Sequence, residues 1–224
     1  MAGGFTTAGL ALFALFAYPQ FESLTPQNKT MVLRKRYWLY YALQFMAGAR
    51  RQIFVVFAGF MMVEKFGFSA AEISIMFLVN GALNMVCAPQ IGKFIGRWGE
   101  RRALTLEYIG LIVVFAAYAF VSNPWVAVGL YVLDHLLFSM AIAQKTYFQK
   151  IADPRDMAPT AGVAFSINHI AAVVIPALLG LVWIYNTSWV FYIGAAFAFC
   201  SLILSHLIPC NPREGVEFRY QEKD

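Results

Sequence analysis

Six long apolar runs follow one another along this chain and constrain its fold more than any other feature. They cover about residues 37–63, 70–95, 102–121, 125–149, 158–184 and 188–208. A helix needs roughly 20 apolar residues to cross the hydrocarbon core of a bilayer. Charged residues make up only 13% of the chain, against about 25% in soluble domains. The sequence therefore predicts an all-α, polytopic transmembrane bundle of six strong spans, surrounded by lipid.

The spans and the segments around them divide the chain into four predicted regions. Residues 1–18 contain a short apolar helix, which is a short span, an interfacial helix or the remnant of a preceding span. Residues 19–36, with Pro19 near their start, form a polar cytoplasmic linker. The six-helix transmembrane domain then covers 37–210. Residues 211–224 form a charged cytoplasmic tail that we expect to be poorly ordered.

The basic residues lie almost entirely on one side of the predicted spans. Alternating sides from the first span brings thirteen of them together: Lys29, Arg34, Lys35, Arg36, Lys93, Arg97, Arg101, Arg102, Lys150, Arg155, Arg213, Arg219 and Lys223. The opposite side receives only Lys65. Because cytoplasmic loops are enriched in Lys and Arg, we expect the spans to begin and end in the cytoplasm, in a bacterial inner membrane. The charge of +5 then reflects topology and not a nucleic-acid partner.

The connection between the second and third runs carries the most informative motif. It is short, basic and rich in glycine. Five of its residues resemble the loop signature of the major facilitator superfamily, roughly Gly-x-x-x-Asp-Arg-x-Gly-Arg-Arg: Gly92, Arg97, Gly99, Arg101 and Arg102. Two positions depart from that pattern, since Gly96 stands where the family has Asp and Glu100 stands at a basic position. The alternative is an ordinary positive-inside loop that happens to be rich in glycine.

This resemblance implies a secondary transporter that moves a small solute across the membrane by alternating access. In the family, the signature joins the second and third helices of each six-helix half, and the solute path runs between the two halves. The chain would then be a C-terminal half, and its path would need a homodimer or a separate N-terminal half. The alternative is a truncated, non-transporting membrane protein or scaffold.

Ionisable and polar side chains within the runs are the candidates for a transport pathway or a gate, because such groups are costly in lipid unless paired or hydrated. Arg50 and Arg51 lie midway along the first run, and Asp134 and His135 midway along the fourth. We expect Asp134, as the only acidic residue deep in a span, to be the counter-ion of one arginine. Beside His135 it could also support proton coupling. The other candidates are Gln44, Asn80, Asn84, Lys145, Asn168 and His169.

Structural roles stay open for all of these residues. Polar side chains in spans can join helices instead of binding a solute, and the charged cluster can be a purely structural ion pair. Pro89 and Pro176 permit kinks in the second and fifth runs. The sequence contains no recognised enzyme motif, so we expect a protein that is not an enzyme and that needs neither a cofactor nor a metal.

Overall fold

The computed structural model describes residues 2–17, 25–31 and 33–223. Pro19 and the central part of the predicted linker lie outside the described residues. Within them, six helical segments are long and apolar enough to cross a membrane. The predicted all-α bundle of six strong spans is therefore confirmed.

The first, fourth and fifth spans are each assembled from more than one helical segment, whereas the other three are single helices. The bounds, in chain order, are α1 Ala2–Ala17; η1 Lys35–Tyr37, α2 Trp38–Gln52, η2 Ile53–Ala58 and α3 Gly59–Phe66; α4 Ala70–Trp98; α5 Glu100–Phe120; α6 Pro124–Phe138, η3 Ser139–Ala141 and α7 Ile142–Ile151; η4 Pro154–Asp156 and α8 Met157–Tyr185; α9 Thr187–Ser205; and η5 Arg219–Lys223.

Polar residues at the breaks between runs start the helices. Ser69 and Glu72 form a reciprocal capping box at the start of α4. The side chains of Asn123 and Asn186 accept backbone N–H groups at the starts of α6 and α9. Such caps satisfy amide groups that have no partner within the helix, so each helix starts directly after its capping residue.

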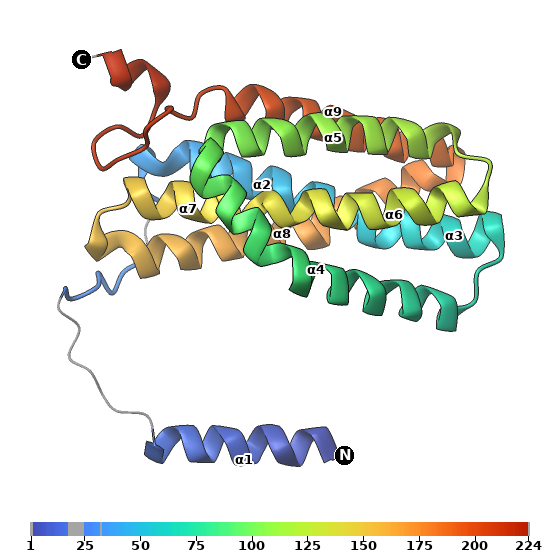
Figure 1. The fold of residues 1–224 in the computed structure, drawn as a ribbon, viewed down its shortest axis with the longest axis horizontal. Coiled ribbons are helices and arrows are strands. Elements are labelled where there is room, and N and C mark those ends of the chain that lie inside the picture. Colours follow the sequence, from blue (N-terminus) through green and yellow to red (C-terminus); the bar gives the residue numbers. More distant parts are fainter. Residues whose placement is uncertain (1, 18–24, 32, 224) are drawn as a thin grey trace.

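The spans run roughly along one long axis, and successive spans alternate in direction (Figure 1). The end of α4, the start of α5, the end of α7 and the C-terminal tail lie at one end of the bundle (Figure 1). The segments that carry the thirteen basic residues grouped by sequence lie there, and we call it the basic end. Lys65 lies at the opposite end, where its Nζ donates to the Val121 carbonyl at 2.6 Å.

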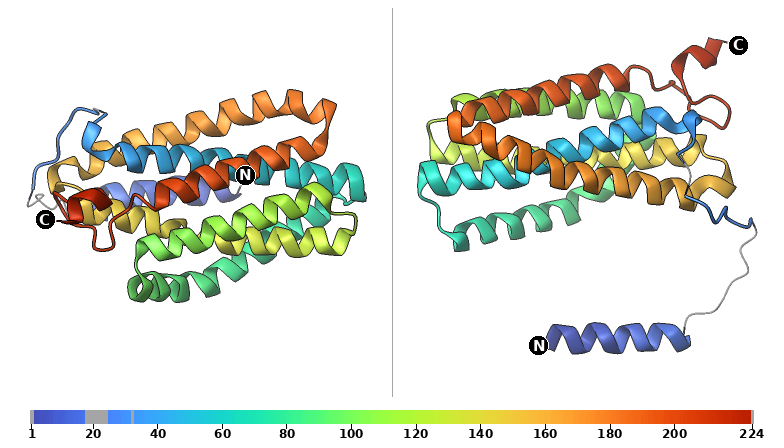
Figure 2. Two further views of the ribbon diagram at one scale, coloured as in Figure 1. Left: turned by 90° about the horizontal axis from the view of Figure 1, so that it is seen from above. Right: turned by 180° about the vertical axis from the view of Figure 1, so that it is seen from behind.

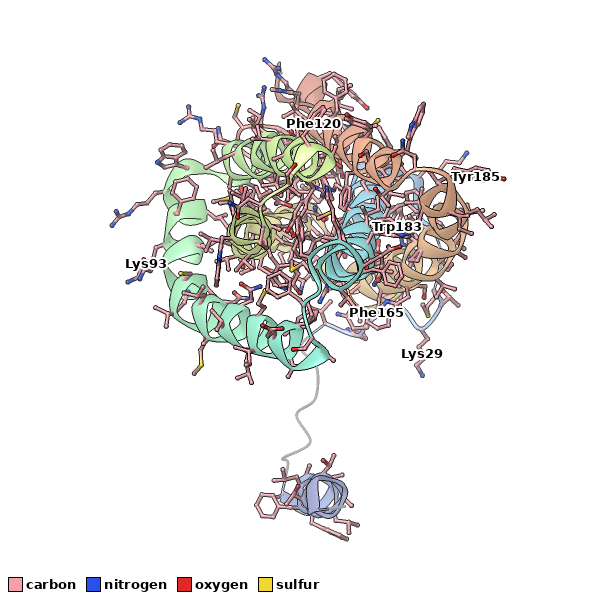
Figure 3. All side chains as sticks on the ribbon, turned by 90° about the vertical axis from the view of Figure 1, so that its right-hand side faces the viewer. Lys29, Lys93, Phe120, Phe165, Trp183 and Tyr185 are labelled. Atoms are coloured by element: carbon pink, nitrogen blue, oxygen red, sulfur yellow. The ribbon has the colours of Figure 1, made fainter. Side chains whose placement is uncertain are left out.

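The outer surface of the bundle is strongly apolar, as lipid contact requires. Large side chains project from it, including Val113 (61% exposed), Phe120 (73%) and Tyr185 (90%). Figure 3 shows Phe120 and Tyr185 at the periphery, seen from the end opposite the basic end. The helix α1 lies apart from the bundle (Figures 1 and 2).

Close packing between α2 and α8 depends on Gly48. A Cβ at this position would lie 2.6 Å from the backbone oxygen of Asn168, so only glycine fits here. The two backbones therefore approach more closely than side chains would allow. This contact fixes the distance between the first and fifth spans.

The predicted Gly-rich loop between the second and third spans is almost entirely helical, which corrects the expectation. Helix α4 continues to Trp98 and α5 begins at Glu100, so Gly99 alone makes the turn, with φ of +84°. Residues that carry a side chain rarely adopt this backbone conformation. Gly92 and Gly96 have open space around them, so neither is required for a close approach between helices.

The linker is attached to the connection between α7 and α8. Asp156 forms an ion pair with the guanidinium of Arg34 at 2.8 Å and accepts a hydrogen bond from the side-chain amide of Asn28 at 2.7 Å. Gln27 donates to the Pro154 carbonyl at 2.7 Å. These contacts hold the described part of the linker against the basic end.

The tail is also packed, in contrast to the poor order expected for it. Glu217 pairs with Arg36 at 3.1 Å, and its carbonyl accepts the Tyr147 hydroxyl at 2.7 Å. The Phe218 ring stacks on Trp38 with centroids 5.7 Å apart. The tail thus ties the start of the first span to the end of α7.

Candidate functional site

One polar cavity of about 810 Å³ opens on a face formed by the first, second, fourth and fifth spans. We call it the polar cavity. Eight of the ten pathway residues suggested by sequence line it: Gln44, Arg51, Asn84, Asp134, His135, Lys145, Asn168 and His169. Residues from separate spans are therefore brought together on one wall, whereas α5 and α9 contribute no lining residue.

Two interruptions of regular α-helix border the polar cavity. The first span contains the π-helical segment η2, from which Phe54 and Val55 line the cavity. The fourth span contains the 3-10 segment η3, from which Ser139 and Ala141 line it. Such short irregular turns are frequent at functional sites. Asp134, Phe138, Ala141 and Lys145 of the fourth span all line the cavity across the second of these interruptions.

Arg50 and Arg51 point to different environments, as neighbours about 100° apart on a helix must. Arg51 is exposed and lines the polar cavity, with its guanidinium 5.4 Å from the Phe138 ring centroid. Arg50 is only 1% exposed and lies over the Tyr108 ring at 4.5 Å. One arginine therefore faces the cavity and the other is enclosed by the bundle.

Asp134 was expected, as the only acidic residue deep in a span, to be the counter-ion of Arg50 or Arg51, but the ion pair of Arg50 is with Glu107 on α5. A guanidinium nitrogen of Arg50 lies 3.7 Å from a carboxylate oxygen of Glu107, whose side chain is fully buried. Sequence placed Glu107 five residues inside the third run, near its edge. The structure starts α5 at Glu100, so Glu107 lies about two turns deep. Its position in an otherwise apolar stretch was the available signal.

Asp134 forms the boundary between the buried ion pair and the polar cavity. It is 3% exposed yet lines the cavity, and Arg50 acts on it electrostatically. Its Oδ1 has no hydrogen-bond partner among the described residues, and neither Glu107 oxygen has one. Two carboxyl groups therefore share one buried guanidinium in surroundings that strengthen charge interactions.

A chain of amide side chains connects the cavity wall to the buried cluster. The Gln44 side chain donates to Gln144 at 3.1 Å, and Gln144 donates to the Tyr108 hydroxyl at 3.0 Å. Asn168 donates to the Gln44 carbonyl at 3.2 Å. Sequence reasoning missed Gln144, which is 1% exposed, because nothing in the pattern distinguishes it from a polar residue at a helix end.

The two candidate histidines lie among aromatic rings. His135 lies 5.3 Å from the Phe54 ring centroid and 5.1 Å from that of Tyr131. The His169 ring lies 3.9 Å from Phe165, and its Nδ1 is 2.9 Å from the Phe165 carbonyl oxygen. Both rings line the cavity without a carboxylate hydrogen bond among the described side chains.

The two asparagines of α4 differ in environment. Asn84 accepts the Ser139 hydroxyl at 3.1 Å, so it joins α4 to η3 while also lining the polar cavity. Asn80 is 2% exposed, does not line the cavity, and has no hydrogen-bond partner among the described residues. No group of three or more His, Cys, Asp or Glu residues within the described ranges is placed to hold a metal ion.

Comparison with known proteins agrees with this arrangement. A sequence model described as Major Facilitator Superfamily matches residues 1–176 and 40–223. The chain belongs to the major facilitator superfamily. It is therefore a multi-pass membrane protein of a transporter family, as the signature around Gly99 indicated.

A relative within the superfamily is the class B tetracycline resistance protein of Escherichia coli. It is 26% identical over 181 residues, which cover 74% of this chain and 41% of that protein. The chain thus spans less than half the length of this curated relative.

Proposed function

We propose that the chain forms one half of a secondary transporter that moves a small solute by alternating access. The observation that carries this proposal is the polar cavity, where candidate residues from four spans meet on one face. The six described spans would supply one wall of the path. A separate N-terminal half, or a second copy in a homodimer, would supply the other wall, since superfamily halves share topology.

The chemistry of the cavity favours an organic anion with an apolar body. Arg51 and Lys145 are exposed cations on its lining, whereas the one carboxyl group there, Asp134, is buried. Aromatic rings of Phe54, Phe138 and other residues cover part of the same surface. An anionic group can bind the cations while rings cover the rest of the solute. The name of the Escherichia coli relative makes tetracycline a further solute to test.

We further propose that the buried cluster couples transport to protons. Arg50, Glu107 and Asp134 together carry one excess negative charge when all are ionised, and no net charge when one carboxyl group holds a proton. Ionisable groups within spans commonly belong to proton relays. Because Asp134 borders the cavity, it is the carboxyl group placed to exchange a proton with water or solute there.

The charge asymmetry supports an orientation. Cytoplasmic loops are enriched in basic residues, so we propose that the basic end and the C-terminus face the cytoplasm. The bacterial relative supports a bacterial inner membrane as the location.

Uptake into proteoliposomes tests the proposal. The chain is first purified in mild detergent and its oligomeric state measured by native mass spectrometry. It is then reconstituted alone and with a co-expressed N-terminal half. Labelled tetracycline and small carboxylates are offered with and without a pH gradient. We expect gradient-dependent flux that Asp134→Asn uncouples and Arg51→Gln reduces, whereas Glu214→Gln, at an exposed position of the tail, leaves it unchanged.

A lack of solute flux in this experiment would contradict the transport proposal. If a folded dimer or a paired half moves none of these solutes, the transport proposal is overturned. The chain would then act as a scaffold whose buried charges serve only structure.

A further inference from the structure

A second cavity, of about 900 Å³, lies at the basic end between the α4–α5 turn, the end of α7 and the segment after α9. We call it the arginine groove. Its lining includes three arginines of the loop signature, Arg97, Arg101 and Arg102, together with Lys150 and His206. It shares no lining residue with the polar cavity. The transport proposal therefore assigns it no role.

Among the described residues, the arginine groove carries more positive than negative charge. Its one carboxylate, Glu100, is buried and bound to Lys150 at 2.6 Å. Arg101 contacts the Cys210 sulfur and the His206 ring, both at 3.4 Å, and neither contact supplies a negative charge. Among the described side chains, none of the three arginines is paired with a carboxylate. Three positive charges thus converge on one concave surface.

The lining changes from charged to apolar with depth along α5. Arg102, Thr105, Leu106 and Ile109 follow helical i, i+3, i+4 and i+7 spacing, so they share one face. Leu106 and Ile109 are 42% and 48% exposed, and both lie in a helix that is long and apolar enough to span a membrane. Seven residues of helix cover about 10 Å, roughly the distance from a lipid phosphate to the upper part of its acyl chains.

Trp98 supports the same placement relative to the membrane. It lines the groove, is 53% exposed, and ends α4. Tryptophan is enriched at the level of lipid headgroups. The arginines beside it would therefore lie at the headgroup layer, with Leu106 and Ile109 in the hydrocarbon below.

We propose that the arginine groove binds an anionic phospholipid, with its phosphate on Arg97, Arg101 and Arg102 and an acyl chain along Leu106 and Ile109. Arginine binds phosphate oxygens in a bidentate manner. The apolar lower wall favours a lipid over a free phosphate, which would leave that wall unused. The departure of Glu100 from the family pattern fits this role, because its bond to Lys150 keeps the carboxylate away from the anion.

Native mass spectrometry of the detergent-purified chain tests the site. Phosphatidylglycerol and phosphatidylcholine are titrated separately, with inorganic phosphate as a competitor. The groove variant is Arg97→Gln/Arg101→Gln/Arg102→Gln. Its control is Lys93→Gln/Arg155→Gln/Arg213→Gln, which removes the same charge from exposed positions outside the groove. Figure 3 shows Lys93 projecting outward from α4.

We expect phosphatidylglycerol to bind more tightly than phosphatidylcholine and to resist millimolar phosphate. The groove variant should lose roughly a hundredfold in affinity, and the control about threefold or less. Equal losses in both variants would overturn the proposal in favour of non-specific attraction to the basic end. Displacement by phosphate with no preference between the lipids would overturn it in favour of a free-anion site.

Two further variants keep the test decisive if the triple variant does not fold. Arg102→Gln removes an exposed side chain that makes no hydrogen bond or ion pair among the described residues, and it should still weaken phosphatidylglycerol binding by about fivefold. Ile109→Ser should weaken lipid binding without changing the charge. Unchanged lipid binding in both would contradict the proposal.

Discussion

Arg50 and Glu107 form an ion pair inside the bundle, with a guanidinium nitrogen and a carboxylate oxygen 3.7 Å apart and side chains 1% and 0% exposed. No hydrogen bond among the described residues reaches the Glu107 oxygens or the terminal nitrogens of Arg50. The pair therefore depends on charge attraction in a low-dielectric environment, so each partner is costly without the other.

Glu107→Gln should destabilise the protein, because it removes the carboxylate that pairs with Arg50 and leaves Asp134 as the remaining buried carboxyl group that acts on this guanidinium. We expect a loss of up to about 3 kcal/mol in the free energy of unfolding, below the about 3–5 kcal/mol of a buried charge left with no counter-charge, measured by denaturation in detergent. Glu214→Gln makes the same chemical change at an exposed position and should have little effect. The double variant Arg50→Met/Glu107→Leu should recover much of the loss. If the single variant is as stable as the wild type, the two side chains do not form a buried pair.

Gly48→Ala should disrupt the contact between α2 and α8. The new methyl group would meet the Asn168 backbone oxygen at 2.6 Å, and a helix backbone cannot move as a side chain can. We expect a loss of about 1–3 kcal/mol, seen as a lower melting temperature. Gly81→Ala is the matched control, since open space surrounds Gly81 within α4, and it should be neutral or slightly stabilising. Equal melting temperatures for the two variants would contradict the close approach.

Gly99→Ala should strain the α4–α5 turn. The residue has φ of +84° and ψ of 155°, a region that costs an L side chain about 1–3 kcal/mol. Gly96→Ala, three residues earlier and within the helix, should be tolerated. Thermal unfolding of both variants measures the difference. A Gly99→Ala protein as stable as Gly96→Ala would show that the turn does not need glycine.

Cysteine labelling in native membranes should show that the polar cavity contains water. In a background with Cys87, Cys200 and Cys210 replaced by Ser, His169→Cys should react with a charged maleimide. Val113→Cys replaces a residue that is also exposed, at 61%, but it lies on the outer surface of the bundle, where lipid should exclude the reagent. Equal labelling at both positions would contradict a hydrated cavity bordered by lipid-facing helices.

The packed tail should resist proteolysis at the basic end. Glu217→Ala removes the carboxylate that binds Arg36 at 3.1 Å and should speed cleavage after Arg219 by trypsin several-fold. Glu214→Ala, on an exposed neighbour, should not. Rapid cleavage of the wild-type tail would support the loose tail expected from sequence.

Much of the fold could be predicted because lipid imposes simple requirements on sequence. Span length and apolar composition suffice to locate six helices, and the caps at Ser69, Asn123 and Asn186 mark where three of them start. The predicted loop around Gly99 was too long because charged residues such as Arg97 and Glu100 look like loop residues. In the structure they extend helices beyond the apolar run, where backbone hydrogen bonding continues.

The candidate residues were identified largely because a polar side chain is energetically unfavourable in lipid unless it is paired or hydrated. A polar side chain within a span needs a partner or water, so Gln44, Arg51 and Asn168 were predicted to border a pathway. The three residues line one cavity. The same reasoning cannot say which polar residue meets which. It assigned Asp134 to one of the two arginines and did not identify Glu107 of α5, which forms the ion pair with Arg50.

The sequence by itself determined that six segments, all within the described residues, are long and apolar enough to cross a membrane, which end carries the positive charge, and which family the chain resembles. These properties depend on local composition and on one motif, and each can be read along the chain. Only the tertiary structure decided that Arg51 faces the polar cavity while Arg50 is buried, that Gly48 sets the distance between α2 and α8, and that the linker and tail pack on the basic end. Those contacts join residues far apart in sequence, and helix packing in three dimensions selects them.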